Sequence, residues 1–166
     1  MHSLTPDNRL QPSLLDRLRD DEPFKEKERP EQQVLNLKQL REVILRDLAL
    51  LLNCDNMETV ADLSHFPDVK NSVLNFGIPS FSGSTSSSTK NDAMVADVKE
   101  AILKFEPRII PNSLAIQSVP GENSGQGENT FALQIEGKIW AQPFPLEFLL
   151  RSELDLETGN VIVEQI

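Results

Sequence analysis

The hydrophobic period of the chain changes near its middle, from about 3.6 residues to two. Residues 37–52 place apolar side chains at steps of three and four, which predicts an amphipathic helix with a wide buried stripe. Residues 92–105 repeat this pattern, with Asp92 as the expected N-cap and Pro107 ending the helix, because proline disfavours helical geometry at the residue before it. The stripes are formed by Leu37, Leu40, Ile44, Leu48 and Leu51 in the first helix, and by Met94 or Val95, Val98, Ile102 and Phe105 in the second.

Two weaker features separate these helices. Residues 67–76 are predicted to form a short helix that Pro67 opens and Gly77 closes. Residues 80–92 are rich in serine and are expected to be a flexible loop.

The second half of the chain alternates apolar and polar residues. This alternation predicts half-buried strands over residues 131–139 and 144–156, with a turn at Glu157–Asn160 before a last strand, Val161–Ile166. Residues 109–118 are expected to add a further strand. Helices that come first and strands that come later indicate an α+β fold, with N-terminal helices packed on a mainly antiparallel C-terminal sheet.

The first thirty residues differ from the rest of the chain. They are rich in proline and charge, and they predict an extended arm, residues 1–30, ahead of a single domain at residues 31–166. The arm contains one short amphipathic segment, Ser13–Asp20, which is too short for a stable isolated helix. This segment therefore docks on the chain's own core, docks on a partner, or has no fixed structure.

Composition and charge narrow the function. The formal net charge is −10, which is not the basic footprint of a nucleic-acid binder or of a protein that sits on anionic lipid. No apolar segment approaches the length of a membrane span, and we expect neither a secretory signal nor direct membrane insertion. One cysteine, Cys54, and two histidines allow no internal disulfide and predict no metal or other cofactor.

Candidate catalytic residues are weak. The chain has no GxSxG, P-loop or GxGxxG motif. A glycosidase needs two carboxylates beside a sugar cleft, but Glu106 lies two residues from Arg108, which would make it a poor proton donor. Aromatic residues are only 5% of the chain, whereas sugar clefts are usually lined by them. These observations disfavour an enzyme.

The segment Glu106-Pro107-Arg108 is the first candidate binding site. Proline fixes the backbone between two opposite charges. One interpretation is a helix stop whose charges pair with nearby groups. The other is a rigid docking knob, because arginine offers a planar fork to a partner's carboxylates or carbonyls.

The last strand is the second candidate site. It has neither proline nor lysine, and a terminal edge strand can accept a strand from another protein. Alternatively, it lies inside the sheet or is covered by the N-terminal arm. The candidate residues are Val161, Ile162, Val163, Glu164 and Gln165.

Five segments in this order resemble a known family. They are PSLLDRL at 12–18, REVILRDLALLLN at 41–53, SVLNFGIP at 72–79, FEPR at 105–108 and DLETGNV at 155–161. The chain is similar to the TssE family of baseplate subunits of bacterial type VI secretion systems, and to contractile-phage baseplate wedge proteins that carry a "lysozyme-like" label. The long serine-rich loop departs from the family pattern but lies outside these segments.

The resemblance implies a structural role without catalysis. It implies a small sheath-subunit-like α+β domain in the cytoplasmic, membrane-docked baseplate, where it initiates polymerisation of the contractile sheath. Glu106, Pro107 and Arg108 would contact the wedge subunits TssF and TssG, and the strand Val161–Gln165 would pair with sheath subunits. The alternatives are a peptidoglycan-cleaving muramidase that uses Glu106, and a general interaction domain unrelated to contractile machines.

Overall fold

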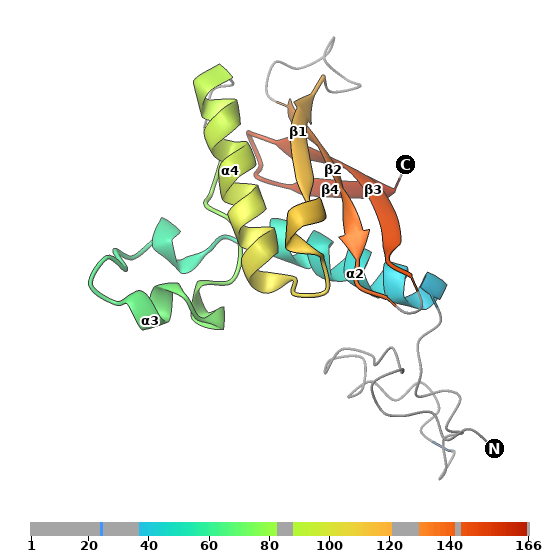
Figure 1. The fold of residues 1–166 in the computed structure, drawn as a ribbon. Helices are drawn as coiled ribbons and strands as arrows, with labels where there is room; N and C mark the ends of the chain where they lie inside the picture. The colour runs from blue at the N-terminus through green and yellow to red at the C-terminus, as the bar shows by residue number, and fades with distance from the viewer. Residues whose placement is uncertain (1–23, 25–36, 83–87, 121–129, 142–143, 166) are drawn as a thin grey trace, which may run out of the picture.

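The protein combines helices with one antiparallel sheet, as the sequence predicts (Figure 1). Its structure is a computed structural model that describes residues 24, 37–82, 88–120, 130–141 and 144–165. The sheet has the strand order β1-β2-β3-β4, with every neighbouring pair antiparallel. The elements are α2 (Leu37–Leu52), α3 (Pro67–Lys70), α4 (Ser88–Phe105), β1 (Ala115–Val119), β2 (Thr130–Ile139), β3 (Leu146–Asp155) and β4 (Val161–Gln165), with short 3-10 turns η3 (Met57–Thr59), η4 (Val73–Asn75) and η5 (Pro111–Ser113).

One face of the sheet forms the core together with α2 and α4. The register places Ile135 opposite Leu150, and both are fully buried. Alternate residues of the same strands, such as Glu136 and Glu147, are exposed on the other face. The core residues contributed by the two helices are Leu40, Ile44, Leu48, Leu51, Leu52, Met94, Val98, Ala101 and Ile102.

The helix predicted at residues 37–52 is confirmed at both ends. The Asn53 side chain follows it and donates from Nδ2 to the carbonyl oxygen of Ala49 at 2.8 Å, which satisfies a carbonyl of the last turn. The buried stripe differs from the predicted one at its first residue, because Leu37 is exposed.

The prediction of one continuous helix over residues 67–76 is wrong. Helix α3 ends at Lys70, and a separate 3-10 turn, η4, begins at Val73. Ser72 divides them, because its hydroxyl accepts a hydrogen bond from Leu74 N–H and so caps the second turn. A serine that can bond to the local backbone competes with a continuing helix.

The start of α4 also differs from the prediction. The helix begins at Ser88, so Asp92 lies within it and is not its N-cap. Packing of the apolar stripe against α2 and β1 stabilises this helix, and such packing extends a helix into residues of modest propensity. The end at Phe105 is as predicted.

Two strand predictions are too long. Within residues 109–118, Pro111 opens η5, and the strand β1 begins only at Ala115. Residues 144–156 contribute β3 from Leu146, while Phe144 precedes the strand and is exposed. Apart from Phe24, the arm lies outside the described residues, as do its segment Ser13–Asp20 and the last residue, Ile166.

Candidate functional site

The Glu106-Pro107-Arg108 turn links the end of α4 to the sheet. Glu106 N–H still bonds to the Ile102 carbonyl oxygen at 2.9 Å, as in a helix, but Pro107 has no N–H to continue the pattern. Beyond the turn, the Arg108 carbonyl oxygen accepts a 2.7 Å hydrogen bond from Trp140 N–H. The turn is therefore fixed on both sides, by the helix and by the end of β2.

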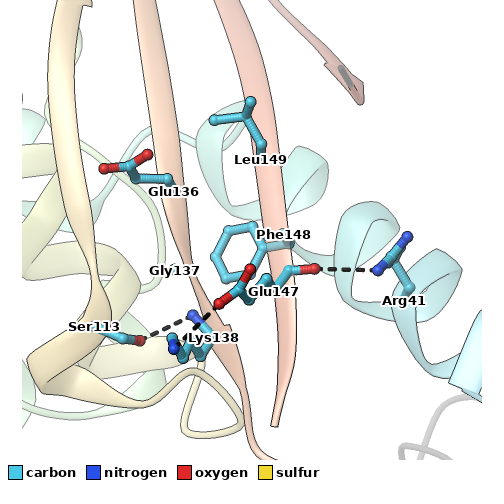
Figure 2. A pocket seen from close by; sticks show the side chains of 8 residues that line it. All are labelled: Arg41, Ser113, Glu136, Gly137, Lys138, Glu147, Phe148 and Leu149. Carbon is cyan, nitrogen blue, oxygen red and sulfur yellow. Dashed lines mark hydrogen bonds and ion pairs between the residues drawn. The ribbon is translucent and has the colours of Figure 1, made fainter.

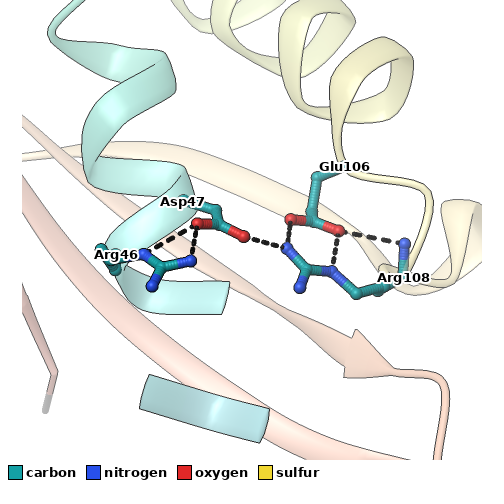
Figure 3. A network of polar contacts seen from close by, with 4 residues as sticks. All are labelled: Arg46, Asp47, Glu106 and Arg108. Carbon is teal, nitrogen blue, oxygen red and sulfur yellow. Dashed lines mark hydrogen bonds and ion pairs between the residues drawn. The ribbon is translucent and has the colours of Figure 1, made fainter. Parts of the chain in front are cut away.

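A chain of four charged side chains joins this turn to α2 (Figure 3). Arg108 donates from Nε to Glu106 Oε1 at 2.6 Å, and its Nη2 contacts Glu106 Oε2. The same Nη2 donates to Asp47 Oδ2 at 2.6 Å, and Asp47 Oδ1 accepts from Arg46 Nη2 at 2.7 Å. Acid and base alternate along the chain, so each guanidinium lies beside a carboxylate.

Burial differs sharply along this chain. The side chain of Glu106 is 4% exposed, whereas those of Arg108 and Asp47 are 27% and 24% exposed. Burial acts to lower the pKa of Arg108, but its hydrogen bonds to Glu106 and Asp47, and their charges, outweigh this effect and raise that pKa above its ordinary value. Arg108 is therefore a permanently charged group held in one orientation.

The turn therefore acts as a helix stop with internally paired charges. Glu106 is buried and cannot reach a partner directly, while Pro107 is exposed and Arg108 is partly exposed. Both oxygens of Glu106 accept hydrogen bonds from Arg108, so this carboxyl group is not placed to protonate a glycosidic oxygen. Docking through Pro107 and Arg108 stays a prediction.

Strand β4 is at one edge of the sheet, so the interpretation that it lies inside the sheet is wrong. Successive residues of β4 direct their backbone N–H and carbonyl groups alternately toward β3 and away from it. Asn160 directs its carbonyl oxygen toward β3, where Asp155 N–H donates to it at 3.0 Å, whereas Val161 directs its N–H and carbonyl away from β3. By the same alternation, the outward groups are those of Val161, Val163 and Gln165.

Residues missed by the sequence reasoning lie in the segment 54–80, between α2 and α4. Asn75 is buried, and its Nδ2 donates to Glu58 Oε2 at 3.0 Å while its Oδ1 accepts from Glu58 N–H at 3.1 Å. Lys70 Nζ donates to the other Glu58 oxygen at 2.8 Å, and it is the main reason that the pKa of Glu58 is lowered. Asn75 belongs to the SVLNFGIP segment, which was the only signal in the sequence.

This segment buries Leu63 and Ile78 but leaves several other apolar side chains exposed. It projects from the body of the molecule next to α4 (Figure 1). Its exposed apolar residues are Met57, Val60, Phe66, Val73 and Leu74. The segment is therefore held by the polar contacts of Glu58 and by the packing of Phe76 and Ile78 against the core.

An open hollow of about 480 Å³ lies at the end of β2 and β3 that faces α2 (Figure 2). Several of its polar groups are paired: Arg41 Nη2 donates to the Glu147 carbonyl oxygen, and Lys138 Nζ lies 3.1 Å from Glu147 Oε1. Arg41 Nε is buried without a hydrogen-bond partner among the described residues. Ser113 Oγ accepts from Lys138 N–H at 2.9 Å. The arrangement resembles neither a nucleophile with its base nor a pair of catalytic carboxylates with a sugar-binding platform.

Within the described ranges, no three histidine, cysteine or acidic side chains gather as a metal site would require. In the same part of the chain, no helix has the length and apolar character needed to cross a membrane.

Comparison with known proteins decides the family. A family model described as baseplate wedge protein gp25 matches residues 38–143, which is more than half of the chain. The chain belongs to the baseplate wedge protein gp25 family. A search of curated proteins finds no match.

Membership of the gp25 family confirms the resemblance drawn from the sequence, because this is also the family of TssE. The family is a structural component of the baseplate in contractile, phage-like machines, so a structural baseplate role and contact with other baseplate or sheath proteins follow. The matched range contains α2 from its second residue, the Glu106-Pro107-Arg108 turn and the segment 54–80. It ends before β3 and β4.

Proposed function

We propose that this chain is the TssE subunit of a type VI secretion baseplate, in the cytoplasm at the membrane-docked assembly. It docks on the wedge subunits TssF and TssG through the exposed side of the Glu106-Pro107-Arg108 turn. It then starts sheath polymerisation by accepting a strand from a sheath subunit at β4. It performs no catalysis.

The observation that carries this proposal is the fixed orientation of Arg108. Glu106 and Asp47 hold its guanidinium by charge-assisted hydrogen bonds, and about a quarter of the side chain stays accessible beside the exposed Pro107. A partner that binds this surface does not have to immobilise a flexible side chain, which would cost about 0.5–1.5 kcal/mol. A pre-organised arginine at a rigid turn suits a binding hot spot.

The support for strand pairing is the open backbone of β4. Val163 directs its N–H and carbonyl away from β3, and the described residues offer these groups no partner. The exposed Ile162 lies next to it on the other face of the sheet. An edge strand with these features accepts another strand readily.

We expect Arg108→Lys to reduce co-purification with TssF and TssG by about tenfold, because lysine keeps the charge but loses the fork that binds two acceptors. The matched control is Arg46→Lys, which makes the same change at the outer end of the same charged chain. Equal retention of Arg108→Lys and wild type would contradict docking at this turn. Charge reversal at Arg108 is a poorer test, since it places a third carboxylate beside Glu106 and Asp47 and threatens folding.

We expect Val163→Pro to block sheath assembly while the chain still folds, because the lost N–H points outward and is not part of the β3–β4 ladder. Val163→Ala is the control, since it shortens the side chain and keeps the N–H. Sheath formation is scored by electron microscopy, and folding by circular dichroism. Ile162→Pro is less informative, because the Ile162 N–H points toward β3 and its loss would damage the sheet itself. Normal sheaths with Val163→Pro would rule out pairing at this edge.

A further inference from the structure

One side chain occupies part of the open edge of β4. Asn53, directly after α2, accepts the Val161 N–H at its Oδ1, with 2.9 Å between nitrogen and oxygen. Its Nδ2 donates to the Val161 carbonyl oxygen at 2.8 Å. The amide therefore satisfies both outward groups of Val161, as one residue of a neighbouring antiparallel strand would.

This contact divides the edge into a closed part and an open part. Val161 is closed by Asn53, while Val163 and Gln165 direct their backbone groups outward without such a cap among the described residues. The Asn53 side chain is also held by its bond to the Ala49 carbonyl oxygen on α2. Moving it aside would break three hydrogen bonds, so an incoming strand meets a fixed obstacle at Val161.

We propose that Asn53 sets the register of the strand that β4 accepts. This inference rests on the proposed strand pairing. The incoming segment forms hydrogen bonds with the outward backbone groups of Val163 and Gln165. It does not extend to Val161, whose outward groups are bonded to Asn53. It is a short extended stretch, and its residue beside Val163 is apolar, because Val163 lies on the core face of the sheet and packs against the core.

A fixed starting point matters because strands slip easily. A shift of one residue would turn the partner's apolar side chains to the solvent face, and a shift of two would move every contact along the edge. A five-residue strand has too few side-chain contacts to specify register by itself. Because Asn53 blocks Val161, registers in which the partner strand is shifted toward Val161 are excluded.

The test is residue-resolved amide hydrogen exchange on the full chain, with and without purified sheath subunits of the same system. In the wild type, the Val161 amide is slow in both conditions, and the Val163 amide slows by at least about tenfold when the sheath subunit is added. In Asn53→Leu, the Val161 amide exchanges about tenfold faster in the free protein. Adding sheath subunits to this variant slows both amides, because the pairing now extends to Val161.

The outcomes separate the two proposals. If no wild-type β4 amide slows with sheath subunits, strand pairing itself is wrong, and the register inference fails with it. If Val163 becomes protected in Asn53→Leu while Val161 stays fast, pairing is right and Asn53 is only a cap. If Asn53→Leu disturbs folding, Asn53→Ala repeats the test, because the smaller alanine side chain needs less space. Glu164→Gln is the control, since it alters an exposed β4 side chain without freeing an outward backbone group.

Discussion

Replacing Gly77 with alanine will lower the free energy of unfolding by about 4 kcal/mol, because two independent penalties act at this residue. Gly77 has a φ of 122°, a conformation that residues with a side chain rarely adopt. A Cβ atom added there would lie 2.1 Å from the Cys54 carbonyl oxygen. Urea unfolding, followed by circular dichroism, measures the change.

The backbone of Gly77 has no room to move away from Cys54. Cys54 accepts the Ile78 N–H at 2.9 Å, and Ile78 accepts the Asn56 N–H at 2.9 Å, so the two segments are tied on each side of the contact. The control is Gly159→Ala, which has a φ of 74° but whose added Cβ would have its nearest contact at 3.8 Å. We expect it to cost only about 1 kcal/mol. Equal effects of the two variants would mean that the close approach to Cys54 is not important.

Replacing Glu106 with leucine will lower the free energy of unfolding by about 3 kcal/mol, because it removes one partner from a largely buried ion pair. Arg108 keeps Asp47 but loses the acceptor of its Nε and of its backbone N–H, which donates to Glu106 Oε1 at 3.1 Å. Thermal and urea unfolding of the variant measure the loss. Glu106→Gln should cost less, since its amide oxygen still accepts from Arg108.

A double-mutant cycle distinguishes pairing from simple packing. Combining Glu106→Leu with Arg108→Met removes both charges, and the double variant should recover most of the stability that Glu106→Leu loses. Asp47 keeps its contact with Arg46 in this background. If the two losses add instead, the Glu106–Arg108 contact contributes little, and the orientation of Arg108 has another cause.

The elements with a long, regular hydrophobic period could be predicted from the sequence. The stripe in α2 and the alternation in β2 depend on residues that all face one core, and the predicted bounds of α2 are those observed. Short elements were less predictable. Pro111 marks a helix start or a strand start equally well, and Ser72 interrupts a helix only because its hydroxyl happens to reach Leu74 N–H.

The sequence predicts which residues form the candidate site, but not the contacts that they make. The sequence singles out Glu106 and Arg108, yet it does not show that Asp47, sixty-one residues before Arg108, completes the pairing. The contact between Asn53 and Val161 joins residues 108 apart and has no local signature. Such contacts arise when separate elements pack together, so only the folded structure reveals them.

Helix α2 connects the two surfaces that we propose for partners. Asp47 holds Arg108, and Asn53, six residues later and about 9 Å along the axis, holds Val161. A strand paired to β4 and pulled along its length would load the β3–β4 ladder in shear, so that its hydrogen bonds share the force rather than break one after another. The tension would then pass through Asn53 into α2 and reach the Arg108 turn without crossing a loop. The molecule would thus act as a stiff mechanical link between its two neighbours.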